Sequence, residues 1–219
     1  SAASDVYKRQ VVSSDPTFKK FWLLHSIEEP TIEGNRFIVR RTKNGDTGML
    51  QNHVLLPETG NAQIEKVGGK GKEFWVFGTN YPNDALPNRP DDANERGAWR
   101  VEVSPAAPAT EDCFLNVMQV ADNTCKRMHD VKRIDAEKVV GVQIADRIVT
   151  FSRDSRPLSG KVDMKVDGNA AMKFVITDLI PGTWQIKKDG KVYIPAMEVR
   201  SDDGILSFEG TAGHYEFLR

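Results

Sequence analysis

Apolar and polar positions alternate along most of the chain, a pattern typical of strands with one buried face. Val162, Met164 and Val166 alternate with charged residues, so one side of this segment is expected in a core and the other in water. Further strands are predicted at Asp112–Val120, Val139–Ala145 and Arg147–Ser152. Helical periodicity is almost absent. We therefore predict an all-β protein, an antiparallel β-sandwich of stacked sheets with little or no helix.

Turn signals between these segments support the same fold class. Asp189-Gly190 separates the apolar positions of Trp184–Ile186 from those of Val192–Ile194, and we expect a tight hairpin there. Gly34-Asn35 predicts a second hairpin, because glycine and asparagine tolerate the positive φ that such turns need.

Composition and charge limit the classes of partner. The chain has 219 residues, of which 39% are hydrophobic and 28% charged, enough for one sizeable core. Its net charge of -1 gives no general attraction to nucleic acid or to an anionic membrane. Because the sequence contains no apolar run of about twenty residues, we expect no membrane-spanning helix.

The first residues differ from the rest. Residues 1–15 mix charges without clear alternation, so we expect a frayed or foreign segment there and a single β-sandwich domain over residues 16–219. The chain begins at Ser1, not at a methionine, and lacks an apolar leader, so we expect a piece of a longer protein. Tyr81–Gly97, rich in proline and Asn-Asp pairs, is predicted to be a long functional or mobile loop.

Several motifs resemble one enzyme family. The segment Phe18–Pro57 contains WLLHSIEEP, EGN and LLP; Glu65–Asn80 reads EKVGGKGKEFWVFGTN; and Trp99–Pro105 reads WRVEVSP. Together they are similar to the C-terminal β-domain of heparinase II/III-like polysaccharide lyases. The resemblance fades after about Val120. It implies a stacked antiparallel β-domain that accompanies a helical toroid in the parent enzyme.

The resemblance also implies a chemistry. Such lyases cleave acidic polysaccharides beside a uronic acid by β-elimination, which requires a base, a neutralised carboxylate and a proton for the leaving oxygen. In the family these groups come from the toroid and the early β-domain, so we assign no catalytic residue here and expect the chain to be inactive alone. A periplasmic or secreted location is implied as well. The alternative is a free-standing β-sandwich module that binds carbohydrate.

Tyr81, Arg89 and Arg100 are the candidates for contact with a uronic or sulfated chain. A guanidinium binds carboxylate and sulfate in a forked geometry, and an exposed aromatic ring can stack on a sugar. The alternative is a solvated loop with a structural arginine salt bridge. Trp22, Trp99 and Trp184 fall in alternating apolar segments, so we expect them in the core, whereas Trp75 could face either way.

The metal and redox candidates are few. No cofactor is required, but the resemblance implies a structural zinc in the parent enzyme, with His25 as one ligand. The alternative for His25 is a core-edge histidine bonded to backbone. Gly68-Gly69-Lys70-Gly71-Lys72 lacks the spacing of a phosphate loop and predicts a basic connection between strands. Cys113 and Cys125, the only cysteines, could form a disulfide or remain reduced.

Overall fold

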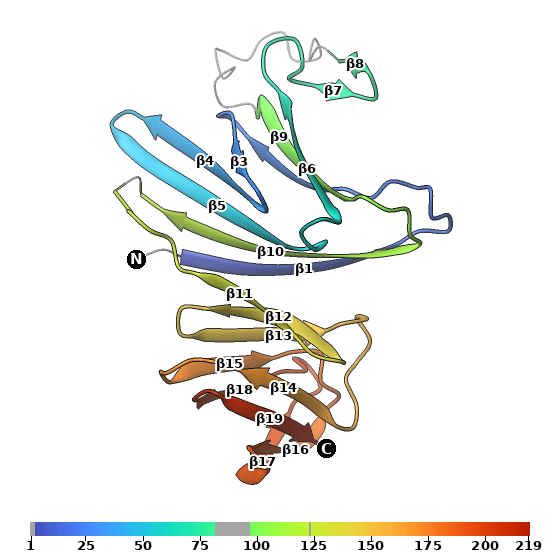
Figure 1. Cartoon of the computed structure of the whole chain (residues 1–219), viewed down its shortest axis with the longest axis vertical. Helices are drawn as coiled ribbons and strands as arrows, with labels where there is room; N and C mark the ends of the chain where they lie inside the picture. Colours follow the sequence, from blue (N-terminus) through green and yellow to red (C-terminus); the bar gives the residue numbers. More distant parts are fainter. Residues whose placement is uncertain (1–2, 82–96, 123) are drawn as a thin grey trace. The chain divides into compact units, whose positions relative to one another are not determined.

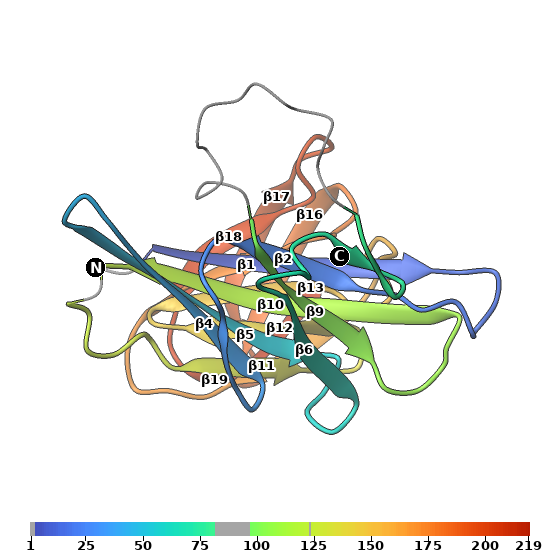
Figure 2. The same cartoon turned by 90° about the horizontal axis from the view of Figure 1, so that it is seen from above.

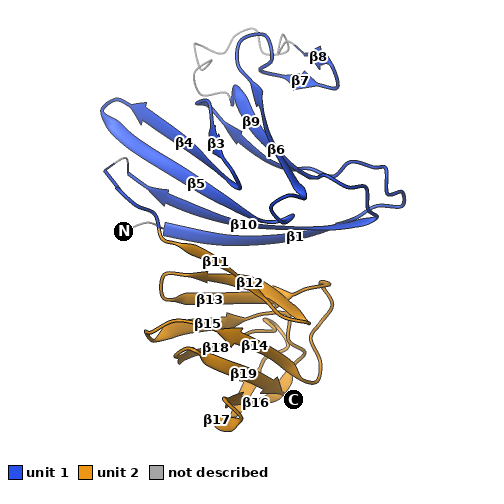
Figure 3. Ribbon diagram, viewed as in Figure 1, with its two compact units in different colours: residues 1–128 blue, residues 129–219 orange. Residues whose placement is uncertain are grey.

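The structure, a computed structural model, describes residues 3–81, 97–122 and 124–219. All regular secondary structure in these residues is β-strand, which confirms the all-β prediction. The chain divides into two compact units, Ser1–Met128 (unit 1) and His129–Arg219 (unit 2) (Figure 3). We expected a single domain over residues 16–219; instead, each unit has a core of its own.

Unit 1 is built from two sheets and a small hairpin. Its strands are β1 (Ala3–Val12), β2 (Trp22–Ser26), β3 (Thr31–Glu33), β4 (Arg36–Lys43), β5 (Asp46–Leu56), β6 (Ala62–Gly68), β7 (Trp75–Val76), β8 (Thr79–Asn80), β9 (Trp99–Pro105) and β10 (Glu111–Ala121). Sheet A has the order β1-β10-β5-β4-β3, sheet B has the order β2-β9-β6, and β7 pairs with β8. All strand pairs in unit 1 are antiparallel.

Strand β1 corrects the prediction of a frayed or foreign start over residues 1–15. It pairs with β10 along its whole length, from Ala3 opposite Val120 to Val12 opposite Glu111. Its half-buried positions include Val6, Lys8 and Gln10. The alternation is hidden in the sequence because the long side chains of lysine and glutamine can cover one face of a strand with their aliphatic stems.

The core of unit 1 lies between sheets A and B. Phe37, Val54 and Phe114 of sheet A pack with Val101 and Val103 of sheet B, and all five are at most 1% exposed. Figures 1 and 2 show sheet B lying across one face of sheet A. The opposite face of sheet B is therefore left outside this core.

Unit 2 pairs a second set of sheets. Its strands are β11 (Val131–Asp135), β12 (Val139–Ile144), β13 (Arg147–Ser152), β14 (Val162–Val166), β15 (Met172–Ile176), β16 (Gly182–Lys188), β17 (Lys191–Val199), β18 (Leu206–Gly210) and β19 (Gly213–Leu218). Sheet C has the order β11-β12-β13-β15-β18 and sheet D the order β14-β19-β16-β17. One pair, β13 and β15, is parallel, because the chain crosses through β14 of sheet D between them.

The predicted alternation and turns of unit 2 are confirmed. Val162, Met164 and Val166 are buried, and Trp184 is fully buried. Asp189 and Gly190 have φ values of 51° and 77° and connect Lys188 to its cross-strand partner on β17, as a tight hairpin requires.

Candidate functional site

The outward face of sheet B carries charged and polar side chains from all three of its strands. Antiparallel pairing places His25 of β2 opposite Arg100 of β9, and Leu23 opposite Glu102. On the other side of β9, Glu65 of β6 is also opposite Glu102. Directly opposed residues share one face of a sheet, so all five side chains lie on the face away from the Val101 and Val103 core. This face is charged along β9, whereas along β2 it carries the apolar Leu23 and the polar His25.

A hollow of about 560 Å³ covers this face. His25, Arg100, Glu102 and Glu65 line it, and the β7–β8 hairpin supplies residues 75–78 as a further wall. Segments from four strands, distant in the sequence, therefore meet at one place. We call this hollow the sheet B groove.

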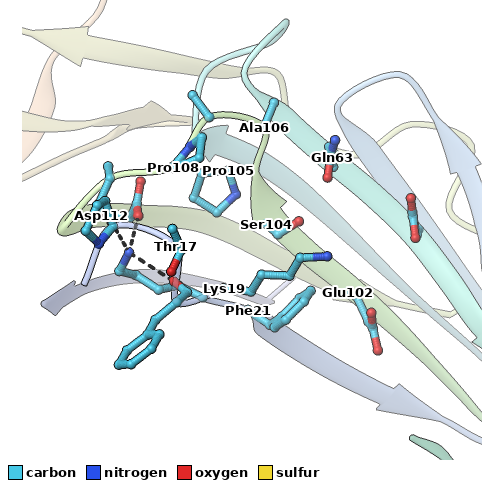
Figure 4. A pocket seen from close by; sticks show the side chains of 16 residues that line it. Thr17, Lys19, Phe21, Gln63, Glu102, Ser104, Pro105, Ala106, Pro108 and Asp112 are labelled. Carbon is cyan, nitrogen blue, oxygen red and sulfur yellow. Dashed lines mark hydrogen bonds and ion pairs between the residues drawn. The ribbon is translucent and has the colours of Figure 1, made fainter. Parts of the chain in front are cut away.

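The sheet B groove continues into a neighbouring hollow of about 420 Å³. The two share Lys19, Phe21, Glu65 and Glu102. Figure 4 shows Lys19 and Phe21 alongside the strand that carries Glu102 and Ser104. The combined surface follows β9 along its length, a shape that suits a linear ligand.

A buried ion pair holds the segment that carries Lys19 and Phe21. The Lys20 ammonium lies 3.0 Å from the Asp112 carboxylate, and their side chains are 5% and 11% exposed. Lys20 also donates to the backbone carbonyls of Ala109 and, at 3.5 Å, Phe18. The entry to β2 is thereby fixed to the start of β10, and Figure 4 shows Asp112 at this end of the hollow.

The two glycines at the end of β6 are required by close packing on Trp99. A Cβ on Gly68 would lie 2.6 Å from the Trp99 Cα, and one on Gly69 would lie 2.8 Å from an indole carbon. Lys66 lies over the same ring at 5.9 Å and pairs with Glu29 at 2.6 Å. This Gly-Gly segment is therefore a packing contact with Trp99.

The β7–β8 hairpin that walls the groove is held by polar side chains. The Asn80 amide oxygen accepts from the Phe74 N–H at 2.8 Å, and Glu73 accepts from the Gly71 N–H at 2.9 Å. Backbone hydrogen bonds, including this one, hold the pKa of Glu73 below its usual value. At the hairpin tip, Phe77 has φ of 45° and is 97% exposed. A bulky residue in the left-handed region is strained, and this ring adds nothing to the core.

The charges in the sheet B groove are balanced. Lys19 and Arg100 are positive, and Glu65 and Glu102 are negative. Arg100 donates from Nε to Glu102 Oε1 at 2.7 Å, and its Nη2 is 2.6 Å from the same oxygen. The two side chains are only 13% and 20% exposed, so the pair is shielded from solvent. The arginine expected to bind an anion is thus already engaged by a carboxylate of the chain.

The structure brings together some of the predicted site residues. His25 and Arg100 are cross-strand neighbours and line the same groove. Tyr81 is 59% exposed and follows β8, but it does not line the groove. Arg89 lies outside the described residues. Contact of these residues with substrate stays a prediction.

The candidate zinc ligand His25 is exposed at the surface of β2. Within the described residues, no three His, Cys, Asp or Glu side chains come together as a metal site would require. A zinc ion at His25 would therefore need ligands from elsewhere. Cys113 and Cys125, both described, are not joined by a disulfide bond.

Glu65, Glu102 and Lys19 were not among the predicted site residues. The sequence did contain a signal for Glu102, because the alternation of WRVEV places this residue on the same strand face as Arg100. For Glu65 and Lys19 the missing information was the strand order of sheet B, which brings together segments that are far apart along the chain.

Comparison with known proteins gives a match within the second unit. Residues 133–219 match the heparinase II C-terminal domain. This match confirms the resemblance to a heparinase II/III-like C-terminal domain, but over unit 2, the part of the chain where we expected it to fade. No curated protein matches the chain. The part of the chain that the structure describes also contains no helix long and apolar enough to cross a membrane.

Proposed function

We propose that this chain is the C-terminal β portion of a heparinase II/III-like polysaccharide lyase that cleaves uronic-acid-containing polysaccharides by β-elimination. The match of residues 133–219 to the heparinase II C-terminal domain and the all-β architecture support this assignment. In this proposal the helical toroid of the parent supplies the catalytic groups. The role of the present chain is to bind saccharide.

The sheet B groove is the surface that we assign to the saccharide. Its floor holds charged side chains, Arg100 and Glu102, and its edges carry exposed apolar ones, including Phe21, Leu23 and Phe77, which are 40%, 46% and 97% exposed. A protein interface has the opposite arrangement, an apolar centre depleted of charge and a polar rim. Aromatic rings beside fixed polar groups are instead suited to a sugar, which has apolar ring faces and hydroxyl edges. This arrangement is the observation that carries the proposal.

Titration calorimetry of the full chain with oligosaccharides that contain uronic acid tests the assignment. We expect binding that is weakened about tenfold by Phe21→Ala and Phe77→Ala together, since stacking on an aromatic ring typically contributes on the order of 1 kcal/mol. Lys173→Ala, an exposed change on β15 of unit 2, is the matched control and should leave the affinity unchanged. Absence of binding to every uronate-containing oligosaccharide would overturn the proposal.

A free-standing carbohydrate-binding module is the second candidate. It is favoured by one observation: all described residues that line the groove belong to unit 1. A measurement of elimination activity distinguishes the lyase portion from the free-standing module. Unsaturated uronate formed by the longer protein encoded at this locus supports the lyase, and binding without any such activity supports the module.

Two further properties belong to the proposal. We infer that the protein acts in the periplasm or outside the cell, because its substrate is a large polymer. We also infer that His25 ligates a structural zinc in the parent, with the remaining ligands upstream. Metal analysis of the longer protein before and after His25→Ala tests this second point, and equal zinc content in both would refute it.

A further inference from the structure

We infer that the sheet B groove binds an uncharged sugar residue of the polysaccharide, and not one of its uronates. The inference rests on the proposed function, because it concerns which unit of a bound saccharide occupies the groove. It follows from the charges of the groove and from the pairing of its arginine.

The first argument is that, among the described residues that line the groove, each lysine or arginine charge is balanced by a carboxylate. Arg100 is the positive group on the floor, and its Nε and Nη2 both contact Glu102 Oε1, at 2.7 Å and 2.6 Å. A uronate would have to compete with Glu102 for this guanidinium. Lys19 is the other lysine or arginine among the described lining residues, and Glu65 balances its charge by count.

The second argument is the position of the two carboxylates. Glu65 and Glu102 are directly opposed on neighbouring strands, so their side chains lie side by side on the groove floor. A third carboxylate beside them would be repelled, and this cost is larger in a partly desolvated groove than in water. Sugar hydroxyls, in contrast, donate hydrogen bonds to carboxylates. These bonds have an ionised acceptor and are stronger than neutral ones.

The third argument concerns the wall. The β7–β8 hairpin presents Phe77 with its backbone in the left-handed region and its ring 97% exposed. Trp75 of the same hairpin lines the groove, as do Phe21 and Leu23 from the opposite side. These apolar groups match the ring face of a pyranose and provide no contact specific to a carboxylate. The groove therefore combines hydroxyl acceptors on its floor with apolar walls.

The experiment compares the affinity of the full chain for three oligosaccharides of equal length. One is a homo-oligomer of uronic acid, one alternates a uronic acid with an uncharged N-acetylhexosamine, and one is an uncharged homo-oligomer of the hexosamine. We expect the two that contain uncharged residues to bind at least about tenfold more tightly than the all-uronate oligomer. Binding of the uncharged oligomer should change by less than about twofold between low and high salt, because no net charge is involved.

A charge reversal in the groove provides a second test of the same inference. Glu65→Lys should raise the affinity for the all-uronate oligomer by about tenfold, since it replaces a repulsive carboxylate by an ammonium. Glu137→Lys makes the same change in net charge at an exposed position of unit 2 and should have no effect. Circular dichroism of both variants checks that the fold is retained.

The outcomes separate this inference from the proposal beneath it. If the all-uronate oligomer binds as tightly as the alternating one, the inference is overturned and the lyase assignment stands. If neither uronate-containing oligomer binds, the proposed function fails. Binding of the alternating and uncharged oligomers, with weak binding of the all-uronate one, supports both.

Discussion

The ion pair of Lys20 and Asp112 permits a quantitative prediction. Lys20→Met keeps the aliphatic stem and removes the ammonium, which leaves an Asp112 side chain that is 11% exposed without its partner 3.0 Å away. Breaking a buried pair from one side typically costs about 3–5 kcal/mol, because the remaining charge is desolvated and uncompensated. The carbonyl of Ala109 also loses its donor. We expect the free energy of unfolding of unit 1 to fall by about 3 kcal/mol.

The double substitution Lys20→Met with Asp112→Leu distinguishes charge burial from packing. Replacing both partners by apolar groups of similar size is often close to neutral, so it should recover most of the loss, to within about 1 kcal/mol of the unsubstituted chain. Lys19→Met is the matched control. Lys19 is the adjacent residue and is exposed, and its change should cost less than about 0.5 kcal/mol.

Urea unfolding followed by tryptophan fluorescence provides the measurement. Trp22, Trp75 and Trp99 lie in unit 1, whereas Trp184 lies in unit 2, so Trp184→Phe leaves a signal from unit 1 alone. The reasoning would be refuted by a loss below about 1 kcal/mol for Lys20→Met, or by a double variant as unstable as the single one.

Three further predictions concern glycine packing, turn strain and pH. Gly69→Ala should destabilise unit 1 by about 1–3 kcal/mol more than Gly71→Ala in urea unfolding. Both glycines have similar φ values, +77° and +81°, but of the two only Gly69 would place a Cβ within 3.0 Å of the Trp99 ring. Equal losses of stability in the two variants would argue against that contact. Phe77→Asn should stabilise unit 1 by about 1 kcal/mol and so raise its melting temperature, because asparagine tolerates positive φ. The same change should lower the affinity for saccharide. A lower melting temperature would contradict the strain argument. Burial raises the pKa of Tyr215 from 10.0 to about 12, so the folded state holds the Tyr215 proton more tightly than the unfolded chain does. This contribution to the free energy of unfolding is fully present below pH 10.0 and is lost as the pH rises toward 12. Tyr215→Phe should flatten the decline in unfolding free energy above pH 10.0, and an unchanged slope would exclude Tyr215 as the group responsible.

The fold class could be predicted from local patterns because alternation and turn chemistry are local properties. Val162, Met164 and Val166 are buried as predicted, and Asp189-Gly190 forms the predicted turn. β1 was missed, because its half-buried face is formed partly by Lys8 and Gln10, whose residue types do not mark a buried position. The division into two units was also missed, since strands of both units have the same sequence pattern.

The candidate site was predicted only in part. Arg100 and His25 were chosen individually, and their direct opposition depends on the register of β2 against β9. The pairing of Arg100 with Glu102 depends on side-chain conformation on one strand face, and the sequence alone does not show that this arginine is already engaged by a carboxylate. Strand order and conformation of this kind are set by tertiary packing and not by the local sequence.

The central claim is that a saccharide binds the outward face of sheet B. Backbone amide chemical shifts of the full chain, followed by NMR during titration with an oligosaccharide that alternates uronic acid and N-acetylhexosamine, test this claim most directly. We predict that the largest shifts occur in β2, β9, β6 and the β7–β8 hairpin, including Leu23, Arg100 and Glu65, and that strands of unit 2 do not respond. Shifts confined to unit 2, or none at saturating oligosaccharide, would contradict it.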